Sequence, residues 1–170
     1  MTFPKNVGQF PLYYAHKNTG RPLHEGKWFE KFRSNYLDVD NEPLYPFGYG
    51  RSYTTFNSGD ITWDRPSMPM DGSLTAKVRL TITGNRDGAE VVQLYIRDKV
   101  AESTRPVKEL KGFQKVFLKA GESREITFKI TPDLLKYYNY ELQYVAEPGA
   151  FDLMIGMDSQ HVKTATFVLH

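Results

Sequence analysis

Cysteine is absent from the 170 residues, which excludes disulfide bonds and thiolate metal sites. No stretch approaches the roughly 20 consecutive apolar residues of a membrane-spanning helix, so no membrane span is expected. A strong excess of one charge is also missing, because 22 basic side chains stand against 20 acidic ones. Without a basic stripe, nucleic acid and anionic membrane surfaces are poor candidate partners.

Residues that could ligate a metal or perform acid–base catalysis are few and scattered. The acidic run at residues 38–42 has neither the glycine nor the distal glutamate of a calcium-binding loop, and we interpret it as a solvated acidic turn. We therefore expect no metal, no cofactor and no catalytic residue in this chain. The four histidines do not have the spacing of a metal site or a catalytic triad: His16, His24, His161 and His170.

The two parts of the chain differ in their sequence patterns. Residues 1–58 combine aromatic residues with prolines and glycines, and they show too little periodicity to form a core of their own. Residues 59–170 carry repeated strand patterns separated by turn signals. We predict an irregular N-terminal leader over residues 1–58 and a β domain over residues 59–170.

The β domain is predicted from alternating side chains. Residues 74–83 alternate apolar and polar residues with the period of a half-buried strand. About seven such strands, with turns every 8 to 12 residues, predict an all-β fold, an antiparallel sandwich of the immunoglobulin or fibronectin type III kind. Further strands are predicted at residues 89–97, 124–130, 149–156 and 164–169, and one helical turn at residues 131–135. Residues 107–113 and 114–118 form either another strand pair or one long bulged strand, with Gly112 as the irregular point.

The join between the two parts is rich in aromatic residues punctuated by Pro46, Gly48 and Gly50. Prolines and glycines disfavour a helix here, while the aromatic side chains can hold two surfaces together. We interpret the segment as a hinge whose aromatic residues form a domain interface: Tyr45, Phe47, Tyr49 and Tyr53.

Residues 43–54 resemble the P-L-(Y/F)-P-F-G-(Y/H)-G-L-S-Y-T signature of family 3 glycoside hydrolases, typified by β-glucosidases. Residues 88–95, 105–113 and 147–151 resemble successive motifs of the C-terminal fibronectin type III-like domain of that family. Residues 3–11 resemble the tract that follows its α/β sandwich domain. The similarity covers nearly the whole chain, in order; one departure is Arg51, where the family usually has leucine.

The resemblance implies a division of labour within a larger enzyme. The family's nucleophilic aspartate lies on a (β/α)8 barrel and its acid/base residue usually lies on the α/β sandwich domain, and no position in this chain matches the motif of either. The resemblance thus implies an accessory, stabilising domain, inactive alone, whose partners are those two catalytic domains. It implies that the parent enzyme hydrolyses β-glucosides or related β-glycosides by a retaining mechanism with two carboxylates. It also implies a periplasmic or secreted parent, although this chain carries no signal peptide.

A carbohydrate-binding module is the alternative function. Aromatic rings can pack against pyranose rings, and such residues also serve as ordinary core or interface residues. The sequence does not indicate the sugar, the linkage or the oligomeric state. The candidate carbohydrate contacts are Trp28, Trp63, Tyr137, Tyr138, Tyr140 and Tyr144.

Overall fold

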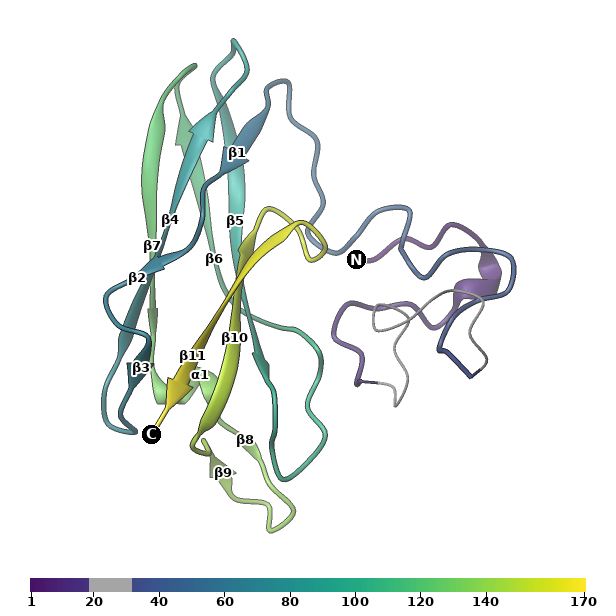
Figure 1. The fold of residues 1–170 in the computed structure, drawn as a ribbon. Helices are drawn as coiled ribbons and strands as arrows, with labels where there is room; N and C mark the ends of the chain where they lie inside the picture. Colours follow the sequence, from purple (N-terminus) through teal and green to yellow (C-terminus); the bar gives the residue numbers. More distant parts are fainter. Residues whose placement is uncertain (19–31) are drawn as a thin grey trace.

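The computed structural model describes residues 1–18 and 32–170. Two β-sheets face each other, and an irregular N-terminal arm lies beside them (Figure 1). The elements in chain order are η1 (Val7–Gln9), β1 (Phe56–Ser58), β2 (Thr62–Trp63), β3 (Ser67–Met68), β4 (Leu74–Ile82), β5 (Gly88–Asp98), β6 (Glu109–Leu118), β7 (Ser123–Ile130), α1 (Pro132–Leu135), β8 (Tyr137–Tyr138), β9 (Tyr144–Val145), β10 (Gly149–Gly156) and β11 (Val162–Leu169).

The strands are arranged as a sandwich. In the first sheet β4 pairs antiparallel with β7 and with the short strands β1 and β2. The second sheet has the order β3–β11–β10–β5–β6, and within it β3 runs parallel to β11. Strands β8 and β9 form a separate hairpin below the two sheets (Figure 1). The predicted all-β sandwich is confirmed.

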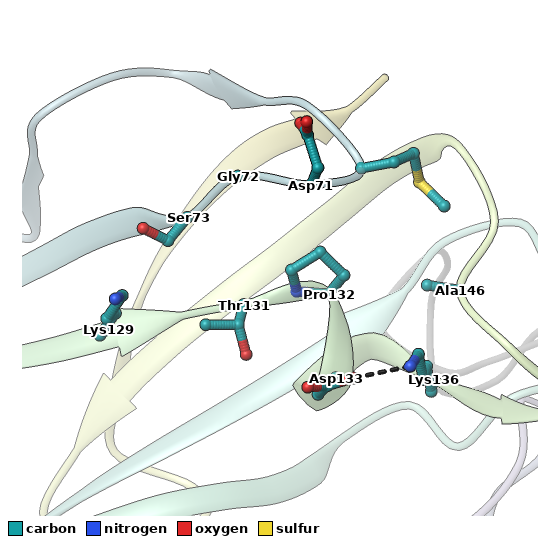
Figure 2. Close-up of a pocket in the computed structure, with 10 residues that line it drawn as sticks. Asp71, Gly72, Ser73, Lys129, Thr131, Pro132, Asp133, Lys136 and Ala146 are labelled. Carbon is teal, nitrogen blue, oxygen red and sulfur yellow. Dashed lines mark ion pairs between the residues drawn. The ribbon is translucent and has the colours of Figure 1, made fainter.

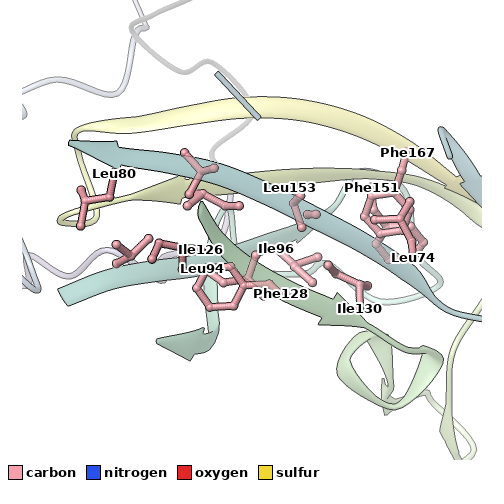
Figure 3. Packing of buried hydrophobic residues seen from close by; sticks show 14 of the residues in the cluster. Leu74, Leu80, Leu94, Ile96, Ile126, Phe128, Ile130, Phe151, Leu153 and Phe167 are labelled. Carbon is pink, nitrogen blue, oxygen red and sulfur yellow. The ribbon is translucent and has the colours of Figure 1, made fainter. Parts of the chain in front are cut away.

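The core lies between the sheets and follows from the alternation of β4. Leu74, Ala76, Val78, Leu80 and Ile82 are buried, while the intervening residues are partly or fully exposed. Figure 3 shows Leu74 and Leu80 among core residues of β5, β7, β10 and β11. Each large apolar side chain that is fully buried contributes on the order of 1.5–3 kcal/mol to folding.

The strand pair β5–β6 contains the predicted irregularity. Leu94 pairs with Gly112 and Tyr95 pairs with Leu110, so one residue of β6 is left over at this point. An extra residue in one strand bends it and increases its twist, as in a β-bulge. The predicted helical turn is also present, as α1 with Thr131 at its N-cap and Pro132 at its first position.

The leader has little regular structure, as its sequence indicates, but Gln9 organises part of it. Its side chain is fully buried and donates to the carbonyl oxygens of Asp40 (2.9 Å) and Glu42 (3.1 Å). The Tyr36 hydroxyl donates to the Gln9 carbonyl over 2.6 Å. The predicted boundary at residue 58 stays a prediction; strand β1, just before it, already pairs with β4. Trp28 lies outside the described residues.

Candidate domain interface

Strand β5 is buried on both faces, unlike β4. Val92, Leu94 and Ile96 point into the core, whereas Gln93 and Tyr95 point to the outer face and are nevertheless buried. A half-buried strand would present such residues to solvent. Something therefore covers the outer face of the sheet at β5, and the cover is the leader.

Gln93 joins three segments that are distant in sequence. Its side-chain amide donates to the carbonyl oxygen of Met157 (2.7 Å), in the β10–β11 turn, and to that of Gly48 (3.2 Å), in the leader. Its side-chain oxygen accepts a 2.5 Å hydrogen bond from the Tyr95 hydroxyl. Because buried polar groups are costly when unpaired, this arrangement specifies where the leader sits.

Aromatic rings close the space around this network. The ring of Tyr14 stacks on Phe47 with centroids 4.5 Å apart and meets Tyr95 edge to face at 5.6 Å. The amide of Ser159 donates to the Phe47 carbonyl over 2.9 Å, and the amide of Val107 donates to the His16 carbonyl over 2.9 Å. Both parts of the leader are thus held to the sandwich, and Phe47 faces the sandwich. We call residues 44–51 the strap.

Gly48 shows why the strap needs a glycine at its centre. Its φ of +82° lies in the left-handed region that L side chains rarely adopt. An added Cβ would also come within 2.2 Å of the Gln93 side-chain oxygen. Both constraints act at one residue, so no other amino acid fits without moving the strap or Gln93.

Charged groups at this contact are partly removed from water. Lys108 donates to the Ser159 carbonyl and its ammonium lies 5.8 Å from the centroid of the Tyr95 ring. Burial lowers the pKa of Lys108, and the nearby Asp158 carboxylate opposes that change. Burial raises the pKa of Tyr95, with smaller contributions from Tyr14 and Asp158. Both groups therefore lie within the contact rather than in open solvent.

The other side of the strap faces away from the sandwich. The rings of Tyr45 and Tyr49 stack at 5.1 Å, and Phe3 meets Tyr45 edge to face at 6.2 Å. Backbone hydrogen bonds hold Phe3 there: its amide donates to the Tyr45 carbonyl (2.9 Å), and its carbonyl accepts from the amides of Leu44 (2.8 Å) and Tyr45 (3.3 Å). Together with Arg51 these residues line an open cleft of about 360 Å³.

Arg51 lines the edge of this cleft beside the two tyrosines. Hydrogen bonding to Tyr49, and more weakly to Tyr45, raises the pKa of the guanidinium above its ordinary value. Tyr53, the fourth predicted interface residue, is 93% exposed. The cleft therefore combines three aromatic rings with one positive charge, and among the described residues nothing fills it.

The predicted carbohydrate contacts are in different environments. Trp63 packs against the core, and Tyr137 is buried with the Arg105 guanidinium 4.7 Å from its ring centroid. Tyr138, Tyr140 and Tyr144 are exposed on the β8–β9 hairpin. Among the candidates in the described part of the chain, only these three have aromatic rings exposed to solvent.

An open groove of about 500 Å³ lies at the same end as the hairpin (Figure 2). Its lining includes Ser73, Thr131, Asp133 and Lys136, and the last two form a 2.6 Å ion pair. Within residues 1–18 and 32–170 no cluster of three metal-ligating side chains exists, and no helix there is long and apolar enough to cross a membrane.

Sequence reasoning missed Tyr14, Gln93 and Lys108. A signal for Gln93 exists: residues 91–96 form an almost continuous apolar run interrupted by this glutamine. Continuous rather than alternating apolar residues are typical of strands buried on both faces. No comparable pattern marks Tyr14 or Lys108, whose neighbours come from distant segments.

Comparison with known proteins identifies the domain type. Residues 90–159 match the family model described as a fibronectin type III-like domain. The chain is 50% identical to the periplasmic β-glucosidase of Salmonella typhimurium over 169 residues, covering 99% of this chain and 22% of that protein. It is 41% identical to a β-xylosidase of Formosa agariphila over 160 residues, covering 94% of this chain and 21% of that protein.

Solved structures agree with these sequence matches. The crystal structure of a β-glucosidase from Listeria innocua in complex with glucose superposes with a TM-score of 0.92 at 40% identity, covering 99% of this chain and 23% of that one. The chain thus spans about a fifth of the length of the relatives it matches.

Proposed function

We propose that this chain, which corresponds to the C-terminal part of family 3 glycoside hydrolases and contains their fibronectin type III-like domain, serves as the accessory domain that supports a catalytic body. The body would consist of a (β/α)8 barrel and an α/β sandwich domain. The two-sided strap carries the proposal, because one side is fixed to the sandwich while the other presents an unfilled aromatic cleft.

The two faces of the strap indicate which predicted interface residues would contact the catalytic body. Phe47 anchors the strap to the sandwich, whereas Tyr45 and Tyr49 face outward and would contact the catalytic body. Tyr53 is exposed beyond the strap and would join the same contact. Aromatic side chains with a polar tip are enriched at interfaces, which supports this assignment. Residues 1–58 would then be the leader that carries this surface.

In this proposal the hydrolytic activity belongs to the larger enzyme of which this chain is the accessory domain. The relatives of this chain are named as β-glucosidases and a β-xylosidase. These names support hydrolysis of β-glucosides or related β-glycosides, with a retaining pair of carboxylates in the catalytic body. The Salmonella relative is named as periplasmic, which supports a periplasmic or secreted parent.

A chimera tests the proposed interface. The matching 22% of the Salmonella typhimurium enzyme is replaced by this chain, and the thermal midpoint and aryl β-glucoside hydrolysis are measured. We expect an active enzyme that loses about 1–3 kcal/mol of stability when Tyr49 is changed to alanine, as for truncation of an interface anchor. Phe113→Ala, at an exposed aromatic residue of β6, is the matched control. Equal effects of the two substitutions would contradict the interface.

A further inference from the structure

The β8–β9 hairpin presents an aromatic surface at the end of the sandwich away from the strap. Tyr138 and Tyr144 are cross-strand partners, and their rings lie 5.0 Å apart at a tilt of 41°. The exposed fractions at the hairpin are large for such side chains: Tyr138 66%, Tyr140 73%, Leu142 79% and Tyr144 53%. Clustered exposure of this kind marks a binding surface more often than isolated apolar residues do.

The orientation of the hairpin is fixed by its first residue. Tyr137 is buried, and its hydroxyl accepts a hydrogen bond from the Glu102 amide over 3.2 Å. Because successive residues of a strand point to opposite faces, the burial of Tyr137 turns Tyr138 outward. Val145, the cross-strand partner of Tyr137, likewise leaves Tyr144 on the outer face.

Side-chain hydrogen bonds hold the turn of the hairpin in one conformation. The Asn139 side-chain oxygen accepts from the amides of Glu141 (3.1 Å) and Gln143 (2.9 Å). Leu142 has a φ of +60°, so the backbone is held in a region that apolar side chains seldom occupy. The tyrosines are therefore presented in a preset arrangement, which reduces the ordering cost of binding.

Polar groups adjoin the rings. The Lys136 ammonium lies 6.0 Å from the centroid of the Tyr144 ring and is paired with Asp133 in the open groove. Figure 2 shows Lys136 and Asp133 on this groove together with the hydroxyl groups of Ser73 and Thr131. Open ring faces beside a carboxylate, an ammonium and hydroxyl groups match the two kinds of surface on a sugar, which has apolar C–H faces and hydroxyl edges.

We propose that the Tyr138–Tyr144 pair and the adjoining groove bind a single chain of a β-linked gluco-oligosaccharide. The tilt between the rings does not offer the flat surface that a crystalline polymer would need, and it suits a twisted single chain. The site itself is independent of the accessory role; the choice of β-linked glucose rests on that proposed function.

Titration of the complete 170-residue chain tests this proposal. Amide shifts in ¹H–¹⁵N spectra are followed while cellopentaose, laminaripentaose or maltopentaose is added. We expect saturable shifts confined to the hairpin and groove with one of the β-linked sugars, and weaker binding of α-linked maltopentaose. No shift at millimolar sugar, or equal binding of maltopentaose, would overturn the proposal.

Variants separate stacking from other roles. Tyr144→Ala should weaken binding about tenfold, in line with the loss of one aromatic contact. Tyr144→Phe should retain binding, whereas Tyr144→Leu, which keeps an apolar side chain without a ring, should lose it. Phe113→Ala, at an exposed aromatic residue of β6, is the matched control and should change nothing.

Self-association is the competing use of the hairpin. If sedimentation shows a dimer that Tyr144→Ala converts to a monomer, the surface is an interface between copies and the sugar proposal fails. An unchanged thermal midpoint for Tyr144→Ala is expected, because the side chain is exposed. Failure here leaves the chimera result intact, so the two proposals are tested separately.

Discussion

Two clusters of aromatic side chains in this molecule have similar chemistry, but one is buried and the other is exposed to solvent. Around Gln93 and Tyr95 the polar atoms are paired and the rings are covered by the leader. At the other end of β10, the hairpin rings remain open. Asp98, at the end of β5, has a buried Oδ2 without a hydrogen-bond partner in the described part of the chain. The closed cluster holds the molecule together, and the open one is available for a ligand.

The strongest way to break the closed cluster is Gln93→Leu. This change keeps the volume but leaves the Tyr95 hydroxyl and the carbonyls of Gly48 and Met157 without their partner. We expect the free energy of unfolding to fall by about 2–4 kcal/mol, measured by urea denaturation. Gln114→Leu, at an exposed glutamine of β6 that bonds the Thr127 carbonyl, should cost less than about 1 kcal/mol. Equal losses of unfolding free energy for the two variants would mean that the Gln93 network stabilises the fold no more than an exposed hydrogen bond does.

A smaller effect, confined to the leader, is expected from Gly48→Ala. The added methyl group would meet Gln93 and strain a left-handed backbone, so the strap should detach at a cost of about 1–3 kcal/mol while the sandwich stays folded. Faster limited proteolysis within residues 1–58, with an unchanged sandwich, is the measurement.

Two glycines serve as controls for this variant. Gly121 has a φ of +75° but no neighbour within 4 Å of an added Cβ, and Gly50 has open space and no positive φ. Gly121→Ala should show strain without release of the leader, and Gly50→Ala should show neither. Release of the leader in either control would contradict the role of the Gly48–Gln93 contact.

The smallest effect concerns Asp98, at the C-terminal end of β5, and depends on pH. Burial, with contributions from the Glu147 and Glu109 carboxylates, raises the pKa of Asp98 from 3.8 to about 6, while the Val100 amide and Arg105 act in the opposite direction. The stability that this carboxyl contributes is complete below pH 4 and is lost as the pH rises through about 6. Asp98→Asn should therefore stabilise the protein by on the order of 1–2 kcal/mol at pH 8 and leave it nearly unchanged at pH 4.

Thermal midpoints measured at the two pH values check this expectation. Asp60→Asn is the control, since the Asp60 side chain is 90% exposed. A gain for Asp98→Asn that is the same at pH 4 and pH 8 would show that the charge of Asp98 is not its cause.

Much of the fold could be read from local pattern. The alternation over residues 74–83 predicts both the strand and its buried face, and Gly112 marks the irregular point of β6. The aromatic join was predicted as an interface, yet nothing in its sequence separates Phe47, which faces the sandwich, from Tyr45 and Tyr49, which face outward. That distinction depends on contacts with β5, some 45 residues later in the chain.

The hairpin shows the same limit. Tyr137 and Tyr138 are adjacent and identical in type, and the sequence offers both as sugar contacts. In the structure Tyr137 is buried beside Arg105, and only Tyr138 reaches solvent.

Local sequence pattern was enough to predict the all-β class, the longer strands and the core face of β4, but not the short strands β1, β2 and β3. The sequence also carried the resemblance to one enzyme family. Strand periodicity and turn residues act over a few neighbours, so they can be read directly. Tertiary structure alone decided which aromatic rings are covered, because burial on the outer face of β5 and the orientation of the hairpin arise from segments brought together only in the folded chain. The same type of side chain can anchor a domain or contact a ligand, depending on whether its tertiary contacts bury it or leave it exposed.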